Sequence, residues 1–321
     1  MKKNNGLRAR FPYWHEATLF ALLFALLVVV RFVDPVFTKL STQSQLSLHV
    51  WELAILSLPM TLLIITGGID LSIGSVMALS AVTLGLAYEA HWPLSACALL
   101  AVAAGLLAGL LNGFFIACLR VHPLIVTLAT LSAFQGAAIG VSQARPFSGF
   151  PEHFARLSHG FIAGVPVPGV LFAVLAVLTA VALAKSRLGR SLFAMGHNET
   201  AARFSGIPVD RIKLFLYALS GAAAGLMAVF HVSLRNTAKA DMGTGMELDV
   251  ITAVILGGTS IFGGRGNVAG TILGVLLIHE TREFVGWRWN QSELNLIVVG
   301  MLLIASVLLN RALAPQAREP S

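Results

Sequence analysis

The stretch of sequence that decides the fold lies at residues 53–76 and reads LAILSLPMTLLIITGGIDLSIGSV. An apolar run is interrupted by Gly67-Gly68 and resumes after a single acidic residue, Asp70. A helix on the surface of a soluble protein has one polar face, whereas this stretch is apolar all round, which is typical of a membrane segment. The break predicts that one membrane helix ends at the two glycines and that another begins just after them.

The whole chain has the composition of a membrane protein. Of its 321 residues, 56% are hydrophobic and only 12% are charged, and this charged share is about half that of a soluble protein. The composition excludes an ordinary soluble enzyme, a disordered chain and a nucleic-acid-binding protein. Cys97 and Cys118 both lie in apolar stretches, so we expect neither a disulfide framework nor a metal-binding cysteine pattern.

Apolar runs long enough to cross a bilayer occur ten times along the chain. Each crossing needs about 20 residues, and Pro59 in the second run is tolerated because neighbouring helices can satisfy the carbonyl group that it frees. We therefore expect an all-α polytopic membrane protein with about ten transmembrane helices, surrounded by membrane lipid. The runs cover residues 17–33, 47–66, 71–88, 94–118, 123–141, 167–184, 211–234, 246–262, 267–285 and 292–310.

Lysine and arginine are distributed unevenly between the two sides that ten spans define. The side that contains both termini carries 14 of the 22 basic residues but only five of the 15 acidic residues. Because basic loops stay in the cytoplasm, this side is predicted to be cytoplasmic. The first apolar run continues into Arg31 and Asp34 without a cleavage site, so we expect a retained anchor and not a signal peptide.

The expected organisation is a single transmembrane domain between two short cytoplasmic tails. The tails cover residues 1–16 and 311–321, and the domain covers residues 17–310. The longest cytoplasmic loop of this domain, residues 185–213, carries helix signals of its own.

A short capped helix is predicted inside this loop. Asn198 is placed to cap a helix that begins at Glu199, and Gly206 is placed to end it. Arg203 lies four residues after Glu199 and so shares its helix face, and Phe204 is the apolar residue best placed to anchor a partner. A polar helix between two membrane spans predicts a docking site for another protein, with an ordinary capped linker as the alternative.

Three features inside the expected spans are candidates for a gate or a substrate pathway. Asp70 either caps the helix that follows it or contacts substrate or a gate. Asn112 lies beside a glycine face of the fourth span and needs a polar partner in hydrocarbon. The third feature is a repeated glycine pair: Gly67-Gly68 and Gly257-Gly258 each follow an apolar run and lie 190 residues apart. Broken helices at matching places suggest an internal repeat of the kind that transporters contain.

Glycines also recur at intervals of four residues within two of the spans. Gly105, Gly109 and Gly113 share a face of the fourth span, and Gly221 and Gly225 share a face of the seventh. This spacing predicts close packing of two helices.

No catalytic or metal-binding constellation is found in the sequence. Neither glycine-rich stretch is followed by Gly-Lys-Ser/Thr, so the chain has no nucleotide-hydrolysing motif. His279 and Glu283 share a helix face, but two ligands are too few for a metal site. An integral membrane enzyme would need a converging acid, base or metal set. A proton-coupled transporter would need a relay of buried titratable groups, for which Asp70 is insufficient.

The chain resembles the permease subunits of bacterial ABC importers for monosaccharides. The resemblance covers nearly the whole chain and rests on residues 66–75, 123–130, 189–208 and 244–266. It implies a ten-helix type II importer permease that acts as a pair of identical or different permease subunits. The stretch at residues 198–206 resembles the coupling helix that meets the ATP-binding subunit.

The resemblance also implies the partners and the cargo. ATP-binding cassette subunits would use ATP and Mg, this chain would bind no cofactor, and a periplasmic sugar-binding protein would deliver the cargo. The location would be the bacterial inner membrane, with multiple passes and both termini cytoplasmic; no nucleic acid is expected as a partner. Residues 278–284 look most like rhamnose-type permeases, while autoinducer-2 and pentose permeases share the core motifs. An ABC permease for nucleosides or branched-chain amino acids is the nearest alternative.

Overall fold

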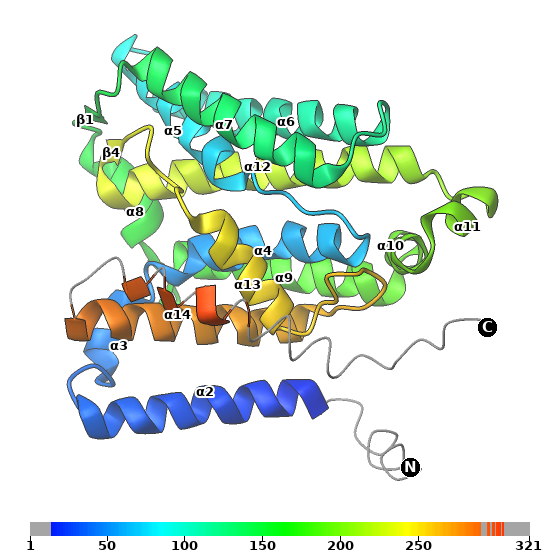
Figure 1. The fold of residues 1–321 in the computed structure, drawn as a ribbon. Helices are drawn as coiled ribbons and strands as arrows, with labels where there is room; N and C mark the ends of the chain where they lie inside the picture. The colour runs from blue at the N-terminus through cyan, green and yellow to red at the C-terminus, as the bar shows by residue number, and fades with distance from the viewer. Residues whose placement is uncertain (1–13, 290–293, 296, 299, 303, 305–321) are drawn as a thin grey trace.

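The computed structural model describes residues 14–289 and, beyond them, 294–295, 297–298, 300–302 and 304. Helices dominate the described chain, and most of them lie side by side along one direction (Figure 1). The elements are α2 (Trp14–Val33), α3 (Leu40–Leu46), α4 (Val50–Ile65), α5 (Ile73–Glu89), α6 (Leu94–Ala117), α7 (Pro123–Ser142), β1 (Phe147–Ser148), α8 (Glu152–His159), β2 (Phe161–Ile162), β3 (Val165–Pro166), α9 (Val167–Lys185), α10 (Arg187–His197), α11 (Glu199–Phe204), α12 (Val209–Arg235), β4 (Thr237–Ala238), α13 (Met246–Leu256) and α14 (Val268–Trp289). The fold is that of an all-α polytopic membrane protein, as expected.

The two ends of the bundle carry different elements. Helices α10 and α11 lie at one end, and α3, α8, β1 and β4 lie at the other (Figure 1). The strands are two residues long and form two antiparallel pairs, β1 with β4 and β2 with β3. They fasten loops together and make no larger sheet within the described residues.

Helices occupy nine of the ten expected spans in the described chain. Five of them are long and apolar enough to cross a membrane (α2, α6, α7, α9 and α12), and α3 and α4 together form a sixth span, bent by 52°. Helix α5 has 17 residues and α13 has 11, because each adjoins a glycine break. The tenth expected span, residues 292–310, lies largely outside the described residues, so the full count stays a prediction.

The predicted C-terminal boundary of the eighth span is wrong. Residues 246–262 were expected to form one helix, but α13 stops at Leu256. Gly258 has a φ of +90°, a conformation that glycine adopts without strain and other residues avoid. The chain therefore leaves the helix at the glycine pair and continues as a loop until α14 begins at Val268.

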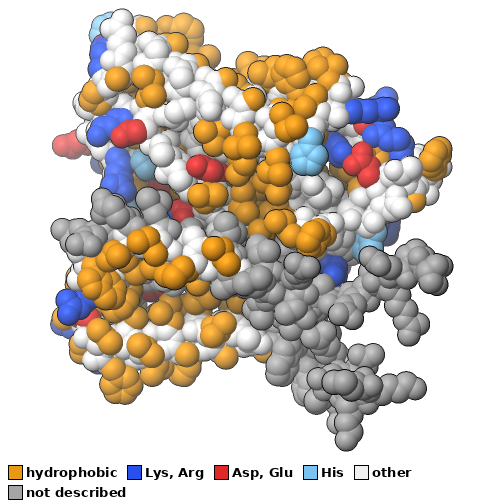
Figure 2. Space-filling model, in the orientation of Figure 1, with side chains coloured by type: hydrophobic (Ala, Val, Ile, Leu, Met, Phe, Trp, Pro, Cys, Tyr) orange, Lys and Arg blue, Asp and Glu red, His pale blue; other side chains and the backbone are white. Residues whose placement is uncertain are grey.

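The helices differ in how deeply their side chains are buried, and this divides them into a central group and a lipid-facing group. Helices α4 and α13 are buried along nearly their whole length. Peripheral helices instead expose large apolar side chains: Phe20 is 63% exposed and Leu99 is 71% exposed. Figure 2 shows such side chains spread over the visible face of the molecule. A soluble protein rarely exposes apolar patches of this extent, whereas lipid tails solvate them.

The predicted glycine contact joins α6 and α12. A Cβ added at Gly109 would overlap the Tyr217 carbonyl oxygen, and one at Gly105 would overlap that of Gly221. The two backbones thus touch without intervening side chains, as the four-residue spacing predicts. Both helices also contribute to the Asp70 network described below, α6 through Asn112 and α12 through Ser220.

Candidate functional site

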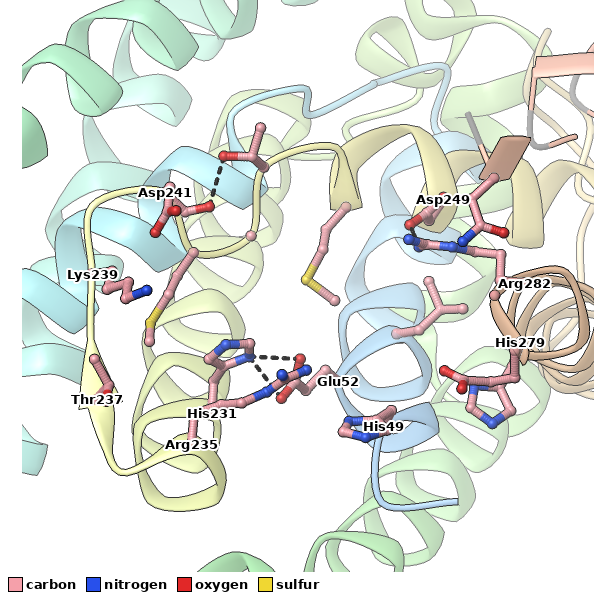
Figure 3. A pocket seen from close by; sticks show the side chains of 18 residues that line it. His49, Glu52, His231, Arg235, Thr237, Lys239, Asp241, Asp249, His279 and Arg282 are labelled. Carbon is pink, nitrogen blue, oxygen red and sulfur yellow. Dashed lines mark hydrogen bonds and ion pairs between the residues drawn. The ribbon is translucent and has the colours of Figure 1, made fainter. Parts of the chain in front are cut away.

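A polar cavity of about 750 Å³ opens at the end of the bundle that carries α3 and β4. Its walls come from the first turns of α4 and α13, the last turns of α12 and α14, and the segment at residues 237–244. Figure 3 shows polar side chains from these elements converging on one space. The ends of four membrane helices thus enclose a polar site that no single stretch of sequence contains.

A hydrogen-bonded pair and an ion pair tie the walls of this polar cavity together. His231 on α12 places its Nδ1 2.9 Å from both carboxylate oxygens of Glu52 on α4. Arg282 on α14 pairs with Asp249 on α13 (Figure 3). Glu52 is 9% exposed and Asp249 5% exposed, and carboxylates at that depth need partners to offset their lost hydration. The pairs therefore fix which helices adjoin one another around the cavity.

Other polar groups in the cavity stay available to a ligand. His279 is only 7% exposed, yet within the described part of the chain it makes no hydrogen bond. The side chains of Arg235, Lys239 and Glu283 also line the space without a hydrogen bond to another described residue. An imidazole that lines the cavity without a partner among the described residues can donate a hydrogen bond to a ligand or accept one from it.

Charge in the lining is nearly balanced. Basic and acidic side chains contribute three and four formal charges respectively, and three histidines accompany them. The described lining contains no aromatic ring other than the histidines, and its larger apolar side chains are Leu53, Met242 and Met246. Such a surface offers many donors and acceptors but no strong net field. It suits a small uncharged molecule with several hydroxyl groups, each of which both donates and accepts.

Asp70 lies elsewhere, in a buried network between α5, α6 and α12. Its Oδ1 accepts hydrogen bonds from the Ser72 backbone N–H (3.0 Å) and the Ser72 hydroxyl (2.7 Å). Its Oδ2 accepts from the Ser220 hydroxyl at 2.7 Å. Asp70 does not cap α5 itself, because Ser72 is the N-cap residue of that helix. The carboxylate instead ties the glycine break to α12.

Asn112 belongs to the same network. Its Nδ2 donates to the Ser72 hydroxyl at 2.8 Å, which supplies the polar partner that its position demands. Tyr217 extends the network by donating to the Ile69 carbonyl oxygen at 3.2 Å. The Asn112 Oδ1 is buried without a partner in the described chain. These groups fasten the break in place and do not line the polar cavity.

The four glycines proposed for a gate or pathway also lie away from the polar cavity. Gly67 has a φ of +79° and open space beside it, and Gly68 packs against the Tyr217 hydroxyl. A Cβ on Gly257 would meet Gly270, and one on Gly258 would meet the ring of His15. Each pair ends a buried helix, α4 or α13, on the side facing α10. The sequence thus identified the breaks but missed the cavity, whose residues are spread from 49 to 295.

Helix α11 is capped as the sequence predicts. The Asn198 side chain accepts a hydrogen bond from the Ala201 N–H at 2.9 Å, and Gly206 has a φ of +81° just beyond the last turn. A further helix, α10, precedes it and was not expected; its N-cap is Ser186, which accepts from the Gly189 N–H. The loop is therefore a pair of short helices and not one capped segment.

Ion pairs brace α11 on α12. Arg203 donates to both oxygens of Asp210 at 2.7 Å, and Lys213 donates to Glu199 at 2.6 Å. The pKa of Arg203 lies above its ordinary value, chiefly because Asp210 accepts its hydrogen bonds. The predicted pair of Arg203 with Glu199 is present but longer, at 3.4 Å. Phe204 is 89% exposed, so the apolar ring is the part of this helix left for a partner.

The described chain shows no group of three or more His, Cys, Asp or Glu side chains arranged to hold a metal ion. His279 and Glu283 line the polar cavity, but the two do not form part of such a group. The chemistry that these residues can perform is reversible hydrogen bonding and ion pairing.

Comparison with known proteins gives a consistent family. Residues 44–307 match the family described as branched-chain amino acid transport system / permease component. The autoinducer 2 import system permease protein LsrD of Yersinia enterocolitica is 36% identical over 261 residues, which are 79% of this chain and 79% of the relative. The LsrD of Klebsiella pneumoniae is 33% identical over 299 residues, or 91% of this chain and 90% of the relative. No solved structure matches the chain.

Proposed function

The chain belongs to the family of branched-chain amino acid transport system permease components, and we propose that it is the membrane-spanning subunit of an ATP-driven importer for autoinducer 2 or a similar sugar-like molecule. The two relatives with that printed name align with 79% and 91% of the chain at 36% and 33% identity. Rhamnose and pentoses are the next candidates for the cargo. We rank autoinducer 2 above rhamnose as the cargo because of these relatives, although the similarity of residues 278–284 favours rhamnose.

The observation that carries the proposal is the chemistry of the polar cavity. Its charges are nearly balanced, its most buried carboxylates are already paired, and His279 is buried without a partner in the described chain. A neutral polyhydroxylated molecule can satisfy such groups without bringing a charge that would need its own partner. A weak site of this kind is sufficient in a channel-forming subunit when a separate binding protein selects the cargo.

A branched-chain amino acid, the cargo in the family's description, fits this lining less well. Its apolar side chain would need a continuous apolar pocket, because leaving it among polar groups forgoes the stabilisation of burial. Leu53, Met242 and Met246 do not supply one, since they are three apolar side chains in a lining that also carries seven charged side chains and three histidines. A proton-coupled carrier is also disfavoured, because the deepest cavity acids already have partners: Asp249 is in an ion pair with Arg282, and Glu52 is hydrogen-bonded to His231.

The proposed assembly consists of two permease subunits, ATP-binding cassette subunits and a periplasmic binding protein. This chain would dock the ATP-binding subunit through α11, where Phe204 is exposed and the helix is braced from behind. ATP and Mg would act at the partner, and the site of the complex would be the bacterial inner membrane. Whether the second permease is identical to this chain or a different one is decided by co-purification of two differently tagged copies.

Cargo uptake tests the proposal. A strain that lacks this gene should lose ATP-dependent uptake of labelled autoinducer 2 and regain it with the gene restored. L-rhamnose, D-ribose and L-leucine serve as comparison cargoes, and a partner ATPase without its phosphate-binding lysine serves as the energy control. Uptake of leucine in place of autoinducer 2 would refute the sugar-like cargo. Uptake that continues with the defective ATPase would refute the energy source.

A further inference from the structure

Three segments that are distant in sequence meet backbone to backbone near α11. The Gly264 N–H donates a hydrogen bond to the carbonyl oxygen of Ile65, the last residue of α4, at 2.9 Å. Gly196, near the end of α10, lies against both of these groups. We call this contact of Ile65, Gly196, Gly263 and Gly264 the glycine junction.

The glycine junction has no room for a side chain. A Cβ added at Gly196 would overlap the Ile65 carbonyl oxygen and the Gly264 nitrogen, and one at Gly263 would come within 2.9 Å of the Gly196 carbonyl oxygen. Gly263 and Gly264 also have φ values of +81° and +74°, which disfavour any other residue. The three segments therefore touch through rigid backbone with no flexible side chain between them.

Each segment of the junction continues into an element with a role in transport. Gly196 lies two residues before Asn198, the cap of α11. Ile65 ends α4, which begins beside Glu52 in the polar cavity, and Gly264 follows α13, which begins beside Asp249 in the same cavity. Helices α4 and α13 also pack against each other. Helix α4 thus runs from the junction to the cavity, and the loop that carries Gly263 and Gly264 joins α13, which ends at Leu256, to α14, which begins at Val268; both of these helices also line the cavity.

We propose that Gly196 is a positioning residue of the transport cycle, which passes displacement of α11 through the glycine junction to α4 and α13 and so to the walls of the polar cavity. The inference rests on the proposed function, since it needs an ATP-driven partner that moves α11. Gly196 touches neither cargo nor nucleotide; it acts by keeping α10 in direct contact with the end of α4 and with the loop that follows α13.

A second connection runs through α12, but it is softer. Arg203 with Asp210 and Lys213 with Glu199 link α11 to α12 by side chains of which three are more than a third exposed. Long, solvated ion pairs can follow many arrangements at similar free energy, whereas close-packed backbone has few. A movement of α11 is therefore transmitted more faithfully by the junction than by these pairs.

The test uses the reconstituted transporter with Gly196→Ala in this chain. An overpacked contact of this kind costs enough to reduce a coupled step by about tenfold, so we expect that loss in uptake, with basal ATP hydrolysis and subunit assembly kept. Stimulation of the ATPase by cargo-loaded binding protein should be lost. Gly140→Ala is the matched control, because Gly140 is a helical glycine with open space around it.

A distant readout separates positioning from general damage. Lys239→Cys, placed in a variant with Cys97→Ala and Cys118→Ser, reports on the polar cavity through its rate of reaction with a maleimide. That rate should change on addition of ATP and vanadate in the parent, and the change should be lost with Gly196→Ala. A parent whose rate does not change, or a Gly196→Ala variant whose change persists, overturns the inference.

His197→Ala covers the case in which Gly196→Ala does not assemble. The exposed His197 ring packs on Gly264, so its removal loosens the junction without overlap. We expect a smaller loss of stimulated ATPase activity with normal assembly, and wild-type behaviour of this variant would then overturn the inference. Absence of ATP-driven uptake in the wild-type complex would instead refute the proposed function.

Discussion

At the scale of single residues, Asp70 accepts three hydrogen bonds and contacts no cation among the described residues. Its role in the structure is to hold Ser72 and Ser220, and thereby the glycine break and α12, in one arrangement. The network requires acceptors at these positions more than it requires a negative charge. Asparagine retains one acceptor oxygen, and its amide can donate to the Ser220 hydroxyl, which is able to accept.

Asp70→Asn is therefore expected to keep both folding and uptake. Asp70→Leu leaves the Ser72 and Ser220 hydroxyls buried without an acceptor and should cost about 1–3 kcal/mol for each group left unsatisfied. Thermal unfolding of the purified permease in detergent measures the difference. Ser80→Ala on α5 is the control, because the Ser80 hydroxyl already lacks a partner in the described chain. A folded Asp70→Asn variant without uptake would show that the charge itself acts in a gate.

At the scale of elements, α11 is held on α12 by ion pairs on one face and exposes the ring of Phe204 to solvent. Because Phe204 is 89% exposed and the ion pairs of Arg203 and Glu199 hold the helix on α12, Phe204→Ala should leave the permease as stable as the wild type. It should instead weaken binding of the ATP-binding subunit, since a small contact depends on few anchors. Co-purification of the two subunits measures this. Glu199→Arg is a poorer test, because it also breaks the pair with Lys213.

A matched control for Phe204→Ala is Phe215→Ala, which removes a ring of the same size that is 51% exposed on α12. We expect this control to assemble normally with the ATP-binding subunit. If Phe204→Ala also assembles normally and transports at the wild-type rate, the docking surface lies elsewhere in the loop.

The elements that the sequence predicts well are those with local causes. Apolar runs located nine helices, Asn198 and Gly206 located the ends of α11, and glycine spacing located the contact of α6 with α12. The end of α13 was missed because the apolar run continues through Gly257-Gly258, and hydropathy does not register a change of backbone conformation. Helix α10 was missed although Leu188, Leu192 and Met195 recur at helical spacing, because a search for long apolar runs does not detect a short amphipathic helix.

The polar cavity could not be predicted because its lining residues come from segments that are far apart in the sequence. Lys239, Asp241 and Asp249 lie close together in the sequence, and His279 and Glu283 follow some 30 residues later. They line one space only because the ends of α12, α13 and α14 pack together around α4, and tertiary packing of this kind leaves no mark on residue spacing. Pairing partners were hidden for the same reason: Glu52 and His231 are 179 residues apart.

At the scale of the whole molecule, charge and architecture agree on a direction. Six basic residues lie between Lys185 and Lys213, in and beside α10 and α11, and the polar cavity opens at the opposite end of the bundle (Figure 1). Positive loops favour the cytoplasmic side, which would place α11 in reach of an ATPase and the cavity in reach of a periplasmic binding protein. Both proposed partners therefore require the same orientation, although each was inferred from different residues.

This orientation is tested by single cysteines at the two ends, introduced after Cys97→Ala and Cys118→Ser. Ser148→Cys lies on β1 at the cavity end, and Arg190→Cys lies on α10; both positions are exposed. A membrane-impermeant maleimide should label Ser148→Cys in intact cells with an opened outer membrane, and Arg190→Cys only after the inner membrane is permeabilised. The reverse pattern would place α11 in the periplasm, where no ATP is available to drive it. Labelling of both from outside would mean that residues 148 and 190 lie on one side of the membrane. The number of spans between them would then have to be even, whereas the structure has one spanning helix, α9, between these two positions.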